Sequence, residues 1–306
     1  MRDDAIGFLL KSGAEAPECA DVAAWWPRFC ATARIWRNPM DRAIVAGFCA
    51  DRVAWAFASG YQAALHALFP GAPEDRICAL CVTEEDGNTP KAIKTSLAGD
   101  RLNGSKKWTT LGPDGGLFFV AARDEAASTE RPAIRVARVD SSLAGIRIEP
   151  MPATKFVPEV PHARLHFDNV AIAGDALLPG DGYEQYVRPF RTVEDLHVHG
   201  AILAYLVREA RRLGWPQGWI ERALSVLFTM ERLSSENPSS PSTHLGLAGT
   251  FAASAALVAE SESHWKRAGA DPAAARWERD RDLLNVAGGI RALRTRRAWE
   301  RLGPAA

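Results

Sequence analysis

Apolar positions along the chain follow two rhythms, one typical of strands and one typical of helices. Residues 77–83 form a short run rich in apolar and β-branched side chains, which is typical of a buried strand. Residues 164–168 alternate polar with apolar side chains, so one face of a strand there would point inward. Residues 190–212 instead carry one apolar stripe at spacings of three and four, which predicts a helix.

The region between residues 77 and 175 reads as a series of short strands joined by turns. A second β-like run ends in Lys106-Lys107-Trp108-Thr109-Thr110, and further strands are predicted over 117–120, 134–139 and 146–148. Gly99-Asp100 and Asn103-Gly104 are expected to be turns, because Gly and Asn tolerate positive φ. Such strands predict a small barrel or sandwich.

Helical patterns lie on both sides of this β region. Residues 1–36 look helical, and residues 41–69 are apolar nearly all round, as in a buried helix. Later helices are predicted over 219–233 and 243–269, and Asp271-Pro272 is expected to open a last long one. The sequence thus predicts an α+β fold of three domains: an N-terminal helical domain (1–76), a central β domain (77–175) and a C-terminal helical bundle (176–306).

Composition excludes several classes of protein. The chain has 306 residues with 37 basic and 37 acidic side chains, so no net charge draws it to nucleic acid. No apolar run approaches the ~20 residues that cross a membrane, and the first residues do not resemble a signal peptide. Five scattered cysteines favour a reducing, cytoplasmic location, and no His or Cys spacing predicts a metal site.

One carboxylate in the predicted helix over 190–212 is a candidate for acid–base chemistry. Glu194 shares a largely apolar face with Val198, Ala201 and Tyr205. Desolvation on such a face raises a carboxyl pKa, and His197 is one helical turn away. The alternative is a carboxylate at a helix start that the helix dipole stabilises by roughly 0.3–1 kcal/mol.

The β region resembles the middle domain of acyl-CoA dehydrogenases. In that family a Thr-Glu-Pro segment and a Lys-x-Trp-Ile-Thr segment hold the flavin of FAD. Here they read Thr83-Glu84-Glu85, with Glu in place of Pro, and Lys106 to Thr110. The resemblance implies a barrel-like central domain and a FAD site in which Thr83, Trp108, Thr109 and Thr110 contact the cofactor.

The resemblance continues into the C-terminal helices. Most family members carry their catalytic glutamate near the C-terminus, but a smaller branch, including isovaleryl-CoA enzymes, carries it in a Leu-Glu-Arg-Leu context on the first of these helices. Val193-Glu194-Asp195-Leu196 falls on that position. The resemblance therefore implies Glu194 as the catalytic base, although Asp195 stands where the family usually has Arg.

A second cofactor contact is implied near the end of the chain. Asn285-Val286-Ala287-Gly288-Gly289 resembles the Gln-x-Phe-Gly-Gly segment that contacts the FAD of a partner subunit. Asn285, Gly288 and Gly289 are thus expected to bind cofactor, since glycines let backbone N–H groups approach a pyrophosphate. A simple helix cap is the alternative, and the family's Arg-x-x-Phe-Gly segment is not found.

The resemblance implies FAD-dependent α,β-dehydrogenation of an acyl-CoA thioester. The implied partners are the acyl-CoA substrate, an electron-accepting flavoprotein and further copies of the chain in a homodimer or homotetramer. One alternative is a flavin monooxygenase on the same scaffold, with His197 or His199 as the polar group. Another is a degenerate, non-catalytic member that binds a partner subunit or acyl-CoA.

Overall fold

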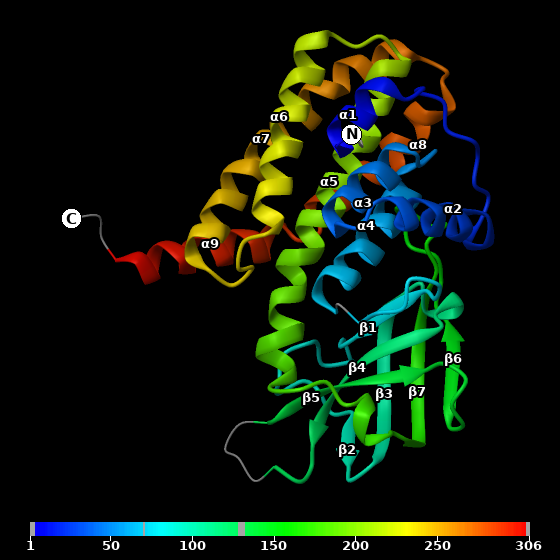
Figure 1. Ribbon diagram of the computed structural model, residues 1–306, viewed down its shortest axis with the longest axis vertical. Helices are drawn as coiled ribbons and strands as arrows, with labels where there is room; N and C mark the ends of the chain where they lie inside the picture. Colours follow the sequence, from blue (N-terminus) through cyan, green and yellow to red (C-terminus); the bar gives the residue numbers. More distant parts are fainter. Residues whose placement is uncertain (1–3, 70, 128–131, 304–306) are drawn as a thin grey trace. The chain divides into compact units, whose positions relative to one another are not determined.

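Figure 1 shows the computed structural model, which describes residues 4–69, 71–127 and 132–303. The chain forms two compact units. A helical unit holds the chain up to Ala67, Lys155–Val157 and the chain from Thr192 onward, and a β unit holds the segments between them. The N-terminal and C-terminal helices thus share one unit, whereas the sequence treats them as two domains, and the three-domain division stays a prediction.

The β unit is built on one seven-stranded sheet. Its path is β1-β4-β2-β3-β7-β6, with β5 paired to β4. β4 runs parallel to β1 and β2, and the other pairs are antiparallel. The strands are β1 (Cys78–Cys81), β2 (Ser96–Ala98), β3 (Arg101–Thr110), β4 (Leu117–Asp124), β5 (Ile134–Asp140), β6 (Ile146–Pro150) and β7 (His162–Ala171).

Side chains from one face of these strands form a single apolar core. Phe118 and Val120 of β4 and Ala163 and Leu165 of β7 are fully buried within it. Alternate residues supply the core because successive side chains of a strand point to opposite faces. Strands therefore form at each of the places where the apolar pattern predicts them.

The sequence predicted a turn at Asn103-Gly104, and this prediction is wrong. Both residues are part of β3. The register with β7 shifts between Leu102 and Gly104, which is a β-bulge. Gly104 has φ +137°, and a Cβ there would lie 2.7 Å from the Thr95 backbone. Gly is therefore required by conformation and by space, while the Asn103 side chain accepts a hydrogen bond from the Asn169 N–H at 2.7 Å.

The helices differ from the predicted ones mainly in where they break. The expected helix over 41–69 is two helices, α3 and α4, because the chain leaves the helical path around Cys49–Arg52. The expected last long helix is also interrupted. The α-helices are α1 (Ala5–Lys11), α2 (Val22–Ile35), α3 (Pro39–Phe48), α4 (Val53–Leu68), α5 (Arg188–Arg212), α6 (Gln217–Ser234), α7 (Pro241–Ala268), α8 (Pro272–Asp280) and α9 (Gly288–Leu302).

Short helical turns complete the chain. Three are 3-10 turns and one, just before α5, is a π turn. Their ranges are η1 (Gly112–Asp114), η2 (Gly174–Ala176), η3 (Tyr183–Val187) and η4 (Arg281–Asn285).

Helix α5 is the centre of the helical unit. Glycines on α3 and α4 face its backbone: a Cβ on Gly47 would overlap the carbonyl of Ala201, and one on Gly60 would lie 2.7 Å from Cα of Val198. Missing side chains thus let three helices approach closely. The packing seals one side of the helix that carries Glu194.

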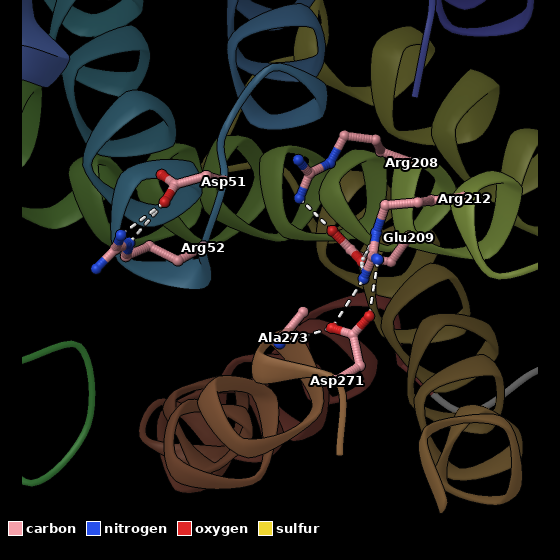
Figure 2. Close-up of polar contacts among 7 residues, drawn as sticks. All are labelled: Asp51, Arg52, Arg208, Glu209, Arg212, Asp271 and Ala273. Carbon is pink, nitrogen blue, oxygen red and sulfur yellow. Dashed lines mark hydrogen bonds and ion pairs between the residues drawn. The ribbon is translucent and has the colours of Figure 1, made fainter. Parts of the chain in front are cut away.

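Charged side chains tie the end of α5 to the start of α8, as Figure 2 shows. Glu209 is buried and accepts from Arg208 and, at 2.6 Å, from Arg212. Arg212 also donates to Asp271 at 2.8 Å, and Asp271 caps α8 by accepting from the Ala273 N–H at 2.8 Å. Asp271 is therefore the N-cap of α8, at the place where the sequence predicts that a helix begins.

A carboxylate near the start of α3 opposes folding at neutral pH. One oxygen of Asp41 is buried and has no hydrogen-bond partner among the described residues. Burial, followed by the negative charges of Glu231 and Asp4, raises the pKa of Asp41 to about 6. A carboxyl pKa raised by folding means that stability falls as the pH rises through this value.

We therefore expect Asp41→Asn to stabilise the protein by about 1 kcal/mol at neutral pH, a figure reduced for partial exposure. The gain should shrink as the pH falls from about 6 toward 4, because Asp41 in the native state then becomes protonated and no longer carries a buried charge. Urea unfolding at several pH values measures it. Asp168→Asn, at an exposed carboxylate, should show no such gain, and an equal gain in both variants would contradict the assignment.

Among the described residues, α7 is the helix that is long and apolar enough, by length and composition alone, to cross a membrane. Core helices can have the same length and composition, so α7 is only weak evidence for a membrane span. It is nevertheless an exception to the expectation that no apolar stretch is long enough to cross a membrane. The part of the chain that the structure describes contains no group of three His, Cys, Asp or Glu side chains able to hold a metal ion.

Candidate functional site

A buried ion pair joins the two segments that the sequence singles out in the β unit. Lys106 Nζ donates to Glu84 Oε1 at 2.6 Å, and the Lys106 side chain has no exposed surface. The backbone N–H groups of Lys94 and Thr95 also donate to Glu84, at 2.8 and 3.0 Å. Burial raises the pKa of Glu84, but the Lys106 charge and these hydrogen bonds outweigh it and hold that pKa below its usual value. The pair therefore fixes the segment after β1 against β3.

Next to this pair, β3 contains a second β-bulge. Between the positions where Lys106 and Thr109 pair with β7, the register shifts by one residue. Lys107 and Trp108 together therefore lie opposite Arg164. The extra residue changes which side chains of β3 point outward.

Trp108 is displayed at this bulge in a conformation that is rare for its residue type. Its φ is +58°, in the left-handed region. Its side chain is 47% exposed, and the edge of the ring packs against His162 at 6.0 Å between ring centroids. The Trp108 N–H points at Met151 Sδ, 3.4 Å away. The bulge thus turns a large aromatic side chain away from the core and leaves it accessible to a ligand.

Glu85 connects the two sides of the bulge. One of its carboxylate oxygens lies 2.7 Å from Lys107 Nζ and the other 2.5 Å from Arg164 Nη1. Hydrogen bonds from Lys107 and then Arg164 lower the pKa of Glu85. In the resembling family this position is usually Pro, so here a carboxylate pairs with the cations on both strands beside Trp108.

The three threonines predicted to contact the cofactor lie in different environments. Thr83 accepts a backbone hydrogen bond from β3 at 2.8 Å. The Thr110 hydroxyl lies 3.5 Å from His162 Nε2 on the half-buried side of the strand. Thr109 is buried, and its hydroxyl points to Cys81 Sγ at 3.9 Å. A ligand at Trp108 could therefore meet the Thr110 side chain but only the backbone of Thr109.

Several residues around Trp108 were not assigned a role from the sequence. Glu85, Lys106 and Arg164 make the ion pairs described above, and Met151 and His162 contact Trp108. One signal was readable, since Lys106 is a charged residue within a strand and Glu84 follows Thr83 in the other motif. The contacts of Arg164 and Met151 depend on strand pairing, which the sequence does not specify.

Glu194 lies in the first turns of α5, within the helical unit. Its side chain is half-buried, and Val198 and Ala201 on the same face are buried. His197 Nδ1 donates to the Val193 carbonyl at 2.7 Å, and burial lowers the pKa of His197 to about 4. The apolar character predicted for this face is therefore present, and His197 is neutral at pH 7.

Asp195, the residue after Glu194, is paired with a cation from another helix. Arg294 of α9 donates to the Asp195 carboxylate and to the Thr192 hydroxyl, the latter at 2.6 Å. Asp195 thus occupies the family's usual Arg position, and a guanidinium 99 residues away in the chain pairs with it. Helix α9 is in this way fastened to α5 on both sides of Glu194 in the sequence.

Asn285, Gly288 and Gly289 lie where η4 meets α9. Asn285 is exposed at the end of η4 and lines a cavity, and the two glycines are the first residues of α9. The Gly-Gly pair therefore begins a helix and does not cap the end of one. Its N–H groups belong to a helix N-terminus, where they have no intrahelical partner.

The sequence matches one protein-family model. Residues 79–170 match the model described as "Acyl-CoA dehydrogenase, middle domain". This segment contains every strand from β2 to β6, together with most of β1 and β7, and both the Glu84–Lys106 pair and Trp108. No curated protein matches the sequence.

Solved structures of low sequence identity share the fold over nearly the whole chain. Butyryl-CoA dehydrogenase from Megasphaera elsdenii is 12% identical, with a TM-score of 0.69 over 91% of this chain and 90% of that one. PigA with FAD and proline is 11% identical, with a TM-score of 0.68 over 98% and 92%. A glutaryl-CoA dehydrogenase from Mycobacterium smegmatis in complex with FADH2 is 13% identical, with a TM-score of 0.64 over 96% and 92%.

The fold is therefore that of the acyl-CoA dehydrogenases, with helical parts and a central sheet as the sequence predicted. Residues 79–170 match the family model of the acyl-CoA dehydrogenase middle domain, and the solved structures named above share the fold at 11–13% sequence identity. The resemblance stated from the sequence is confirmed. The predicted site residues stay predictions, which the geometry above now locates.

Proposed function

We propose that the protein is a FAD-dependent oxidoreductase that introduces an α,β double bond into an acyl-CoA thioester. The observation that supports it most is the middle-domain match over the segment that displays Trp108 on a bulge. The fold neighbours include proteins whose titles name acyl-CoA dehydrogenases and bound FAD or FADH2. These neighbours support the fold, and the residues of this chain support the proposed chemistry.

The residues around Trp108 fit a planar cofactor. The half-exposed indole offers a flat aromatic face, and flat rings stack with such faces. The Thr110 hydroxyl and the backbone of Thr83 and Thr109 would supply hydrogen bonds around it. Glu85 ties down Lys107 and Arg164 on either side of the bulge. The Trp108 side chain would therefore already be in position when the cofactor ring binds.

The reaction requires a base and an acceptor on opposite faces of the substrate. FAD, when bound, takes the β-hydrogen with its two electrons. Glu194 would take the α-proton on its carboxylate, which requires hydrogen-bond reach to that carbon in the bound state. The buried Val198 and Ala201 beside it would exclude water from this carboxylate. The Arg294–Asp195 pair would hold the start of α5 in place.

The first test is whether the purified protein retains FAD. We expect a flavin absorbance band that persists when the protein is mixed with FAD and desalted. Trp108→Ala should weaken FAD binding about tenfold, which corresponds to about 1.4 kcal/mol of lost stacking. Phe228→Ala is the control, because Phe228 is an exposed aromatic residue of α6. A colourless protein that keeps no FAD would contradict the proposal and favour a non-catalytic relative.

The proposal includes the partners that the sequence implied: an acyl-CoA substrate, an electron-accepting flavoprotein, and a homodimer or homotetramer. Exposed apolar side chains on and just before α9 support self-association, namely Val286, Ile290, Trp299 and Leu302. Light scattering of the purified protein measures its mass, and a monomer would contradict this part. A cytoplasmic location stays a prediction.

A further inference from the structure

A cavity of about 470 Å³ lies within the helical unit, among α5, α7, η4 and α9. Its wall on α7 is formed mostly by small and apolar side chains, among them Phe251, Ala255 and Val258. Polar groups enter it from the other elements, among them His199 of α5 and Arg291 of α9. An apolar pocket with a few converging polar groups is the usual form of a small-molecule site. The family match over residues 79–170 includes none of its lining residues, and only Asn285 among them was expected from the sequence to bind cofactor.

Arg291 is a half-buried cation whose hydrogen-bond partners are all neutral. It donates to His199 Nε2 at 2.6 Å and to the Leu284 carbonyl, and its guanidinium lies 5.3 Å from the centre of the Phe251 ring. Burial lowers the pKa of Arg291. Within the described residues no carboxylate forms an ion pair with it, and the nearby Asp195 is paired with Arg294. The Asp195 carboxylate therefore pairs with one of these two guanidinium groups, and Arg291 is left without an ion pair.

His199 adds a second unsatisfied donor to the same wall. Arg291 can only donate, so the Nε2 of His199 accepts and its Nδ1 carries the hydrogen. Burial and the Arg291 charge lower the pKa of His199 to about 3, which keeps the ring neutral. Its Nδ1 is buried and has no hydrogen-bond partner among the described residues. Buried donors are normally satisfied, so an acceptor is missing here.

The acidic residues of the cavity do not supply that acceptor. Glu262 is paired with Arg281, which also binds Glu278. Asp282 is exposed to solvent, where its charge is screened. An excess positive charge therefore remains in the cavity at Arg291, beside Phe251.

We propose that this cavity binds an apolar carboxylate, such as a medium-chain fatty acid, with its carboxylate on Arg291 and its chain along α7. Arg291 has five N–H donors and uses two of them in the contacts above, so donors remain for a carboxylate. The carboxylate would neutralise the unpaired guanidinium charge, and the chain would cover Phe251, Ala255 and Val258. Because the site is built within the helical unit alone, the inference does not rest on the proposed dehydrogenase activity.

Calorimetric titration of the purified protein with decanoate tests the proposal. We expect saturable binding that Arg291→Gln weakens about tenfold or more, and that decan-1-ol, which lacks the charge, does not reproduce. Arg297→Gln is the matched control, since Arg297 is exposed on the same helix and does not line the cavity. Binding that is absent, or unchanged in Arg291→Gln, would overturn the proposal.

A second pair of variants tests the position of the ligand without touching the charge. Ala255→Phe fills the cavity and should abolish decanoate binding. Ala256→Phe adds the same ring at the next residue, which is exposed and does not line the cavity, and should leave binding unchanged. Decanoate binding that survives Ala255→Phe would place the ligand elsewhere and overturn the proposal. So would displacement of decanoate by inorganic pyrophosphate, which would assign the cavity to a phosphate group.

Discussion

Lys106→Met is expected to lower the free energy of unfolding by about 3–5 kcal/mol, the typical cost of breaking a buried ion pair by removing one partner. The substitution keeps an unbranched side chain of similar length but removes the charge. Glu84 then remains as a buried carboxylate that only the N–H groups of Lys94 and Thr95 stabilise. Its pKa should rise, because the charge that holds it down is gone. Urea unfolding followed by circular dichroism measures the loss.

The neighbouring lysine provides the matched control for this prediction. Lys107 forms an ion pair with Glu85, but those side chains are 22% and 59% exposed. Lys107→Met should therefore change stability by less than about 1 kcal/mol, as surface ion pairs do. Adding Glu84→Gln to Lys106→Met should recover part of the loss, because the buried charge is then gone as well. Similar losses in the two lysine variants would show that burial of the pair contributes little.

The pH dependence of the same pair has a definite sign. Folding lowers the pKa of Glu84, so the pair stabilises the native state fully above the unfolded-state pKa of about 4.5. This contribution is lost as the pH falls through the lower, folded-state value. Lys106→Met should therefore differ most from the wild type near neutrality and least in acid.

The sequence predicted the two motif segments but not the geometry that makes them a site. Strict alternation along β3 would put Lys106 and Trp108 on one face and Thr109 on the other. In the structure Lys106 and Thr109 are both buried and Trp108 is exposed, because the bulge adds one residue between them. A bulge depends on how β3 pairs with β7, so local pattern cannot reveal it.

The positions at which helices break are likewise not visible in the local pattern. The sequence predicted the apolar character of residues 41–69 correctly, but apolar side chains continue through the break between α3 and α4 and gave no sign of it. Near the end of the chain, Gly288-Gly289 was recognised, yet whether it ends or begins a helix depends on the turn before it. Local composition predicts that an element exists better than it predicts its ends.

Contacts between distant helices could not be predicted at all. The pairing of Asp195 with Arg294 brings together residues 99 positions apart, and either residue alone reads as an ordinary surface charge. Only the packing of α9 shows how the chain supplies a guanidinium where α5 carries Asp in place of the family's usual Arg. The orphaned Nδ1 of His199 is likewise visible only once Arg291 is known to occupy its Nε2.

Glu194→Gln is expected to reduce the rate of acyl-CoA-dependent flavin reduction by at least about 10²-fold, within the 10²–10⁴-fold range typical of a general base. Gln has nearly the same shape but cannot take up the α-proton. The FAD absorbance band should stay as in the wild type, since Glu194 is not part of the predicted cofactor site. Anaerobic stopped-flow measurement of flavin bleaching gives the rate.

The control for this variant must change a glutamate without touching the proposed base. Glu221 is an exposed glutamate on α6, so Glu221→Gln should reduce flavin at the wild-type rate. Unchanged reduction in Glu194→Gln would exclude Glu194 as the base while leaving the flavin site intact. If the wild type itself binds FAD but no acyl-CoA bleaches it, rapid oxygen consumption with externally reduced flavin would favour the monooxygenase alternative. The base and the cofactor site can thus fail separately, because they are tested by different signals.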